Sequence, residues 1–146
     1  VLNSPLLSIH VSIIMMSYAL LSLTFISAIA YFFTRNSKRE SIISVNKQLT
    51  DLSQIFLYPA ITTLGLGIFI GAIWANISWG TYWGWDPKET WALITFLIYA
   101  IPLHTNSLPA LRKPEKYHFF MLLSFLSILM TYFGVNYILG GMHSYA

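Results

Sequence analysis

The sequence predicts an all-α integral membrane protein with about four transmembrane helices. Hydrophobic residues make up 56% of the 146 residues and charged residues only 9%, whereas soluble domains carry roughly a quarter charged residues. Four apolar segments are each long enough to cross a bilayer, because a spanning helix needs about 20 apolar residues. They leave no room for a soluble lobe, so we expect one membrane-embedded domain over residues 1–146.

The four predicted helices cover residues 9–33, 55–77, 87–105 and 117–139. The third has a defined start, because Asp86 is followed by Pro87 and then by Glu89. An N-cap Asp accepts backbone N–H bonds, a Pro suits the first helical position, and a Glu at the third position can reach back to the cap. Helix capping is therefore the expected main role of Asp86.

Basic residues gather on one side of this arrangement. Seven of the eight lie in the first or the third connection: Arg35, Lys38, Arg39, Lys47, Arg112, Lys113 and Lys116. Because cytoplasmic loops carry the excess of Lys and Arg, this side is predicted to be cytoplasmic. Both termini and the loop between the second and third helices then face the outer side. The net charge of +3 is small and does not indicate nucleic-acid binding.

The first connection contains an amphipathic stretch over residues 41–54. Apolar residues recur there at helical spacing, at Ile42, Val45, Leu49 and Leu52. The pattern is typical of a short helix lying on the membrane interface. An ordinary solvated connector is the alternative, and the two stay open at this point.

The loop between the second and third predicted helices is dense in aromatic residues. Four of the five Trp residues lie within positions 79–91. Trp and Tyr are enriched at membrane interfaces, so an isolated member such as Trp74 can belong to an aromatic belt. The crowding of Trp79, Tyr82, Trp83 and Trp85 indicates instead a platform for a large flat ligand, since aromatic rings stack on other π-systems.

Two histidines are expected at the outer level of this loop. His10 lies at the outer end of the first predicted helix, and His143 follows the fourth. Haem iron takes axial His ligands, and a porphyrin supplies the four equatorial nitrogens itself. A zinc site would need three or four protein ligands, and the chain contains no Cys. We therefore expect an outer haem b site with two His ligands.

Three further polar residues have two readings each. His104 lies near the inner end of the third helix and is expected to be a second ligand site, with His118 or with a residue of another protein as partner. His118 follows the basic run ending at Lys116, and we expect it to be an interfacial residue. Lys88 is expected to be a surface charge at a helix end, contact with a haem propionate being the alternative.

Residues 71–76 and 79–95 form a specific motif, which includes Trp-Gly-Thr-Tyr-Trp-Gly-Trp-Asp-Pro-Lys-Glu-Thr-Trp. It resembles the tryptophan-rich "WWD" signature of haem-handling membrane proteins. The Asp-Pro-Lys-Glu-Thr-Trp form is similar to the CcsA (ResC) branch, which serves system II cytochrome c biogenesis. The resemblance extends over essentially the whole chain, including His10, Leu103-His104 and the closing Gly-Met-His-Ser-Tyr.

The resemblance implies a function and a set of site residues. Proteins of this family hold haem at an outer site and present it to apocytochrome c, whose CxxCH thiols add to the haem vinyl groups. His10 and His143 match the two external axial ligands, and His104 matches an intramembrane ligand whose partner lies elsewhere in the synthetase. His118 matches no ligand position. The other residues expected to contact haem are Trp79, Tyr82, Trp83, Trp85 and Asp86.

The resemblance also implies partners and a location. A ResB/CcsB-type partner protein or fused domain is expected, in a holocytochrome c synthase of the bacterial inner membrane or the plastid thylakoid. Family members carry further helices ahead of this portion, so the chain starting at Val1 is expected to be a C-terminal part. The residues alone leave three alternatives: a b-type electron-transfer cytochrome, a haem transporter subunit, and a structural membrane subunit with aromatic belts.

Overall fold

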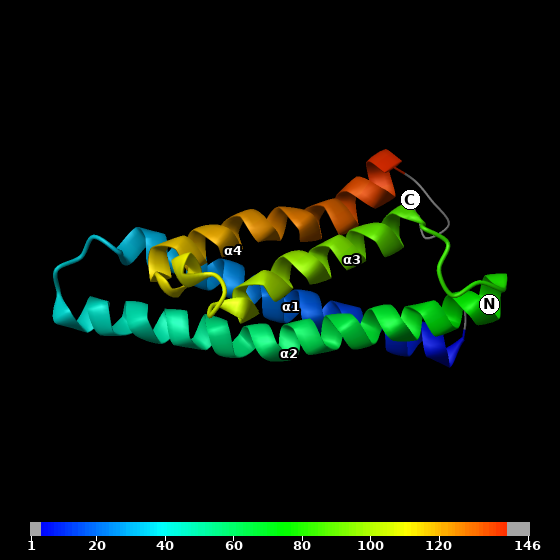
Figure 1. Ribbon diagram of the computed structural model, residues 1–146, viewed down its shortest axis with the longest axis horizontal. Helices are drawn as coiled ribbons and strands as arrows, with labels where there is room; N and C mark the ends of the chain where they lie inside the picture. Colours follow the sequence, from blue (N-terminus) through cyan, green and yellow to red (C-terminus); the bar gives the residue numbers. More distant parts are fainter. Residues whose placement is uncertain (1–3, 140–146) are drawn as a thin grey trace.

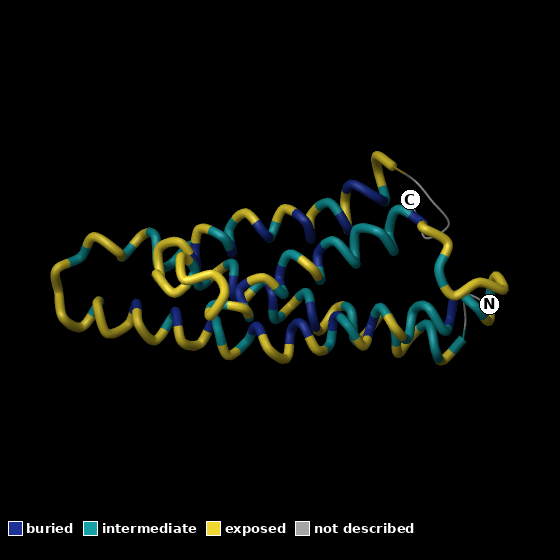
Figure 2. The backbone as a smooth tube through the Cα atoms, in the orientation of Figure 1, coloured by how far each residue is buried: buried dark blue, intermediate teal, exposed yellow. Residues whose placement is uncertain are grey.

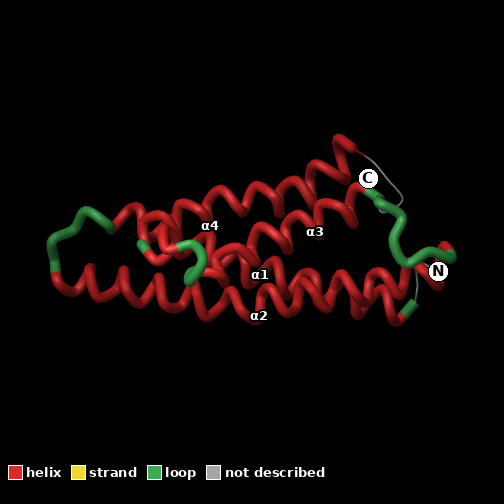
Figure 3. Tube along the Cα trace, viewed as in Figure 1, coloured by secondary structure: helices red, strands yellow, loops and turns green. Residues whose placement is uncertain are grey.

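The computed structural model describes residues 4–139 of the chain. All regular structure in this range is helical (Figure 1; Figure 3). The α-helices are α1 (Pro5–Thr34), α2 (Glu40–Trp79), α3 (Pro87–Ala100) and α4 (Pro114–Leu129), with the 3-10 turns η1 (Ile101–His104) and η2 (Pro109–Arg112) between α3 and α4. A π-helix, η3 (Met130–Leu139), continues α4. The prediction of an all-helical protein is confirmed.

The helices lie along one another in an elongated bundle. α1 and α2 form a long antiparallel pair (Figure 1). α4 packs against α1, and α3 packs against α2. α1 begins, α2 ends, α3 begins and η3 ends at the same end of the bundle. We call it the loop end, because the loop of residues 80–86 lies there. The opposite end, with residues 35–39 and the turns η1 and η2, is called the basic end.

Three helical segments within residues 4–139 are long and apolar enough to cross a membrane: Pro5–Thr34, Glu40–Trp79 and Pro114–Leu139. Their outer faces are strongly apolar, since Phe33, Phe69, Ile77 and Ile138 are between 67% and 87% exposed. Apolar side chains face outward in this way where hydrocarbon rather than water surrounds the protein. The fold therefore has the surface of an integral membrane protein.

α3 is shorter than the helix predicted over residues 87–105. It has 14 residues, or about 21 Å at 1.5 Å per residue, and η1 adds four residues, or about 8 Å at 2 Å per residue. Pro102 has no N–H to continue the α-helical bonding, and the chain goes on in the tighter 3-10 form. α3 and η1 together reach about 29 Å, close to the hydrocarbon thickness of about 30 Å.

Residues 41–54 are neither a separate interfacial helix nor an irregular connector. They form the first part of α2, which runs unbroken for 40 residues, or about 60 Å. The face that packs inside the bundle is polar, since Asn46, Thr50 and Ser53 are at most 9% exposed, whereas Val45 is 46% exposed. The helix continues because α1 and α4 supply partners for this polar face.

The core of the bundle is apolar and draws on all four α-helices. Its fully buried members include Leu21, Leu64, Tyr99 and Met121. Buried positions follow the inner faces of the helices and exposed positions follow the outer faces and the turns (Figure 2). This core joins the two ends of the bundle and positions the helix ends at the loop end.

Candidate functional site

A cavity of about 420 Å³ lies between α1, α2, α3 and η3 near the loop end. Its size falls within the range of about 300–1,000 Å³ that is usual for ligand pockets. Apolar side chains such as Leu7, Ile14 and Ile68 form much of its wall. The polar and aromatic side chains that line it are His10, Tyr18, Trp83, Lys88, Glu89, Thr131, Tyr132, Asn136 and Tyr137.

His10 is held in this cavity by the backbone of α2. Its Nδ1 atom lies 2.8 Å from the carbonyl oxygen of Gly67. Because a carbonyl oxygen only accepts, Nδ1 carries a proton, and the lone pair of the neutral ring is then on Nε2. Metal-binding histidines usually have this arrangement, in which the second ring nitrogen donates to a carbonyl or carboxylate and so sets the orientation of the ring.

Two glycines of α2 make room for side chains of α1. A Cβ at Gly71 would lie 2.6 Å from Cε1 and 2.8 Å from Nδ1 of His10, and a Cβ at Gly67 would lie 2.5 Å from Cδ1 of Ile14. A larger residue at position 71 therefore collides with the imidazole. Glycines four positions apart are a pattern of closely packed membrane helices, so the spacing of Gly67 and Gly71 is a sequence signal for this close approach.

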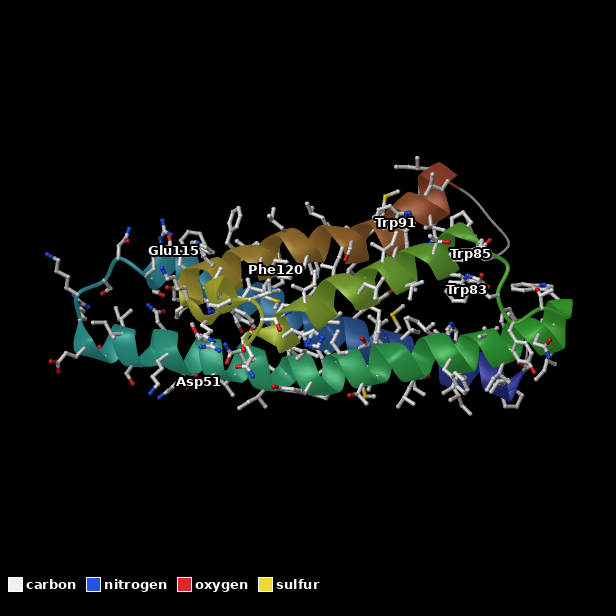
Figure 4. The ribbon with its side chains drawn as sticks, viewed as in Figure 1. Asp51, Trp83, Trp85, Trp91, Glu115 and Phe120 are labelled. Atoms are coloured by element: carbon white, nitrogen blue, oxygen red, sulfur yellow. The ribbon has the colours of Figure 1, made fainter. Side chains whose placement is uncertain are left out.

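The aromatic residues of the loop do not all face the cavity. Trp83 lines it, and Figure 4 shows this side chain between α2 and α3 at the loop end. Trp79, Tyr82 and Trp85 are 37%, 60% and 71% exposed. Trp85 has a left-handed backbone with φ of 55°, which is uncommon for a bulky residue, and its ring meets that of Trp83 edge-on with centroids 5.8 Å apart. The predicted platform is thus divided between the cavity and the outer surface.

The start of α3 confirms the predicted capping box. Oδ2 of Asp86 accepts from the N–H of Lys88 at 3.1 Å, and Oε2 of Glu89 accepts from the N–H groups of Gly84 at 2.9 Å and Asp86 at 3.3 Å. Asp86 is 6% exposed and is not among the residues that line the cavity. The Glu89 carboxylate joins the loop to α3 and so fixes where Trp83 enters the cavity.

Lys88 lies in the cavity wall and not at the surface position expected of it. Its Nζ atom donates to Oδ1 of Asn136 at 3.1 Å. Since Asn136 belongs to η3, this bond joins the start of α3 to the π-helix. Elsewhere along the same pair of helices, the hydroxyl oxygens of Thr95 and Thr131 are 3.2 Å apart. Polar side chains of α3 and η3 therefore meet at two places, and Lys88, Thr131 and Asn136 among them line the cavity.

Among the described residues, the other two histidines, His104 and His118, do not line this cavity. His118 is fully buried, with Nε2 2.9 Å from Oγ1 of Thr50 and its ring stacked on Tyr31 at 4.4 Å between centroids. His118 thus packs inside the bundle, where the polar inner face of α2 supplies its partner. That it lies at the level of the membrane interface stays a prediction. His104 is exposed at the end of η1, and His143 lies outside the described residues.

Comparison with known proteins assigns the chain to a family. A family model described as "Cytochrome C assembly protein" matches residues 1–143. The chain belongs to the cytochrome c assembly protein family.

Relatives of this chain support the CcsA-type resemblance. Protein NrfI of Wolinella succinogenes is 44% identical over all of this chain and 16% of its own length. The cytochrome c biogenesis protein CcsA of Chlamydomonas reinhardtii is 39% identical over 99% of this chain and 41% of its own length. CcsA of Solanum tuberosum is 43% identical over 80% of this chain and 36% of its own length. The chain thus spans less than half the length of each of these relatives.

Two of the eight predicted site residues line the same cavity in the described part of the chain. His10 and Trp83 line one cavity. This is required if the imidazole and the indole ring are to contact the same bound molecule. Lys88 and Asn136 were not predicted to meet, although a polar Asn inside an apolar helix is itself a signal of function. The cavity thus combines an imidazole, an indole ring and an ammonium group with mostly apolar walls.

Proposed function

We propose that this assembly protein binds haem in the cavity at the loop end and presents it for attachment to apocytochrome c. The observation that carries the proposal is the position of His10, which lines the cavity while its Nδ1 is bonded to the Gly67 carbonyl. That bond places the ring's lone pair on Nε2. The CcsA relatives are named for cytochrome c biogenesis, and haem is the group that c-type cytochromes carry covalently.

Haem suits the chemistry of this cavity. A neutral imidazole is a common axial ligand of haem iron, and it must be unprotonated at the coordinating nitrogen. Apolar side chains such as Ile14 and Ile68 cover porphyrin faces, and the Trp83 ring offers stacking or edge contacts. The cargo is haem b, since covalent attachment consumes the vinyl groups that haem b still has.

The proposal includes residues beyond the cavity wall. His143 is the second axial ligand of the outer haem. His104 is the ligand of a second haem site whose other ligand comes from a partner protein. The exposed rings of Trp79, Tyr82 and Trp85 form the outer rim of the haem site, and Asp86 acts by holding the loop that carries them.

Presentation rather than attachment is the expected role of this chain. It has no Cys among its 146 residues, so it cannot form a thioether and can release the haem. A client CxxCH thiol adds across a vinyl C=C bond, with sulfur bonding to one carbon and hydrogen to the other, so the addition needs no external oxidant or reductant. The chain orients the haem for this step within a holocytochrome c synthase that contains a ResB/CcsB-type partner. The outer face of a bacterial inner membrane or the thylakoid lumen is the proposed setting.

The test is the absorption spectrum of the protein purified from cells that make haem. The wild type should show a Soret band, whereas His10→Ala should alter the axial-ligand bands and stop maturation of cytochrome c in cells. Ser12→Ala, which changes an exposed residue on the same helix, is the matched control and should preserve both. No Soret band in the wild type within the complete synthetase, or normal maturation with His10→Ala, contradicts the proposal.

A further inference from the structure

Lys88 places a positively charged side chain in the cavity wall at a position where a positive charge is unfavourable. Lys88 is the second residue of α3, and a positive charge in the first turn of a helix is opposed by the helix macrodipole. Its side chain nevertheless lines a cavity with mostly apolar walls. Placing a charge beside apolar walls costs free energy unless a polar or charged partner stabilises it. Helix stability alone therefore does not explain a lysine at this position.

The two acids of the same turn are bonded to backbone groups. Asp86 accepts the N–H of Lys88, and Glu89 accepts the N–H groups of Gly84 and Asp86. Both carboxylates thus hold the loop at the start of the helix, and the negative charge of Asp86 also stabilises the charged form of Lys88. The capping box fixes the backbone of position 88, and it thereby fixes where the ammonium group enters the cavity.

Asn136 adds a second donor beside the ammonium group of Lys88. An ammonium only donates, so the Nζ bond of 3.1 Å identifies the near amide atom as Oδ1,. The amide nitrogen of the same side chain is then a donor next to the charge. Asn136 lies in the π-helix η3. π-helical turns are rare in proteins overall, and those that occur are often found at functional sites.

We infer that Lys88 and Asn136 bind a carboxylate of the haem, and so recognise the propionate edge of the porphyrin. This inference rests on the proposed function and names the group by which the cavity selects its ligand. His10 comes from α1 and Lys88 from α3, so a metal ligand and a cation face one cavity from different helices. Haem carries a metal, an apolar ring and ionised carboxylates, and it therefore uses all three features of the cavity.

The experiment compares iron protoporphyrin IX with its dimethyl ester, by titration into the protein in a neutral detergent. The ester keeps the iron and the ring but has no ionised carboxylate. We expect the wild type to bind the free acid roughly tenfold to a hundredfold more tightly than the ester, because charge-assisted hydrogen bonds are the strong ones. The detergent contains no anionic lipid, so a lipid headgroup cannot compete for Lys88.

Three variants test the assignment. Lys88→Met keeps the length of the side chain without its charge and should lose most of the preference for the free acid. Lys88→Arg keeps the charge and should retain the preference. Lys116→Met removes an exposed cation at the basic end and is the matched control, which should behave as the wild type. Thermal unfolding of each variant checks that the bundle is intact.

Each outcome separates this inference from the proposed function. A folded Lys88→Met protein that prefers the free acid as strongly as the wild type overturns the inference, and so does a wild type that binds both porphyrins equally. In both cases haem binding itself stands. If added phosphatidylglycerol removes the preference of the wild type while the ester still binds, the anionic headgroup competes with the haem carboxylate for Lys88, as the inference expects. A wild type that binds neither porphyrin overturns the proposed function as well.

Discussion

At the scale of single residues, the site depends on how closely His10 approaches α2. The imidazole bonds to the carbonyl of Gly67, and its Cε1 lies 2.6 Å from where a Cβ at Gly71 would be. The backbone of α2 therefore sets both the tautomer and the position of the ring. A substitution on α2 should consequently displace the proposed iron ligand, His10, without changing that residue itself.

Gly71→Ala is predicted to displace the His10 ring. Overpacking of this kind typically costs about 1–3 kcal/mol, and the displaced imidazole should weaken haem binding and alter the axial-ligand bands. Gly65→Ala is the control, because its Cβ would meet only the ring of Phe96, at 3.1 Å from Cε2. Haem titration and the absorption spectrum provide the measurement, and equal effects of the two substitutions would contradict the prediction.

His118 is predicted to have a structural role. Its ring is fully buried, stacked on Tyr31 and bonded to Thr50. His118→Ala should lower the free energy of unfolding by about 2–5 kcal/mol, as expected for loss of a large buried side chain, while His118→Phe keeps the stacked ring and should cost less. Thermal unfolding measures both. The haem spectrum of a folded His118→Phe protein should match the wild type, and a changed spectrum would make His118 a ligand.

The residue types of the site could be predicted from the sequence, but the directions of the side chains could not. His10 and Trp83 were predicted and share the cavity. Tyr82 and Trp85 were predicted with them and are instead 60% and 71% exposed. The direction of the loop depends on the positive φ of Trp85, and no sequence pattern predicts it, because glycine or asparagine usually occupies such positions.

At the scale of elements, the capping box connects the loop to α3 and can be tested by itself. Asp86→Ala should destabilise the start of α3 by about 0.5–2 kcal/mol, the usual cost of losing an N-cap. Asp86→Asn keeps an oxygen acceptor and should cost much less. Thermal unfolding and amide hydrogen exchange over residues 84–90 measure the effect. If the two variants lose stability equally, the hydrogen bond at 3.1 Å to Lys88 N–H is not what stabilises the turn.

Local signals predicted elements better than long-range ones did. The start of α3 followed from Asp86, Pro87 and Glu89, because capping involves neighbours in the sequence. The continuity of α2 through residues 41–54 depends on Thr50 and Ser53 meeting His118 and Tyr117 of α4. Those contacts join residues more than 60 positions apart. The spacing of apolar residues within 41–54 therefore could not predict them.

At the scale of the whole molecule, the bundle is longer than a bilayer is thick. α2 alone extends about 60 Å, about twice the hydrocarbon thickness. The α1–α2 pair at the basic end is held together by polar contacts, including a bond of 2.5 Å from Oγ1 of Thr34 to Oδ1 of Asn46. An ion pair between Arg35 and Glu115 adds α4 to this end. Such contacts suit a part of the bundle that emerges from the hydrocarbon layer.

The sidedness of the bundle is the prediction on which the outer haem site depends. Seven of the eight basic residues lie toward the basic end, in its turns or in the adjoining parts of α2 and α4. The positive-inside rule therefore predicts that this end is cytoplasmic and that the loop is outside. The chain has no Cys, which makes single-Cys labelling direct. Thr81→Cys at the loop end should react with an impermeant maleimide in intact cells, and Asn36→Cys at the basic end should react only after permeabilisation. The unmodified chain is the control for background. Positions 36 and 81 lie at opposite ends of α2, so labelling of both in intact cells would mean that α2 does not cross the membrane. Reversed labelling would put the cavity on the cytoplasmic side, where an outer client could not reach it.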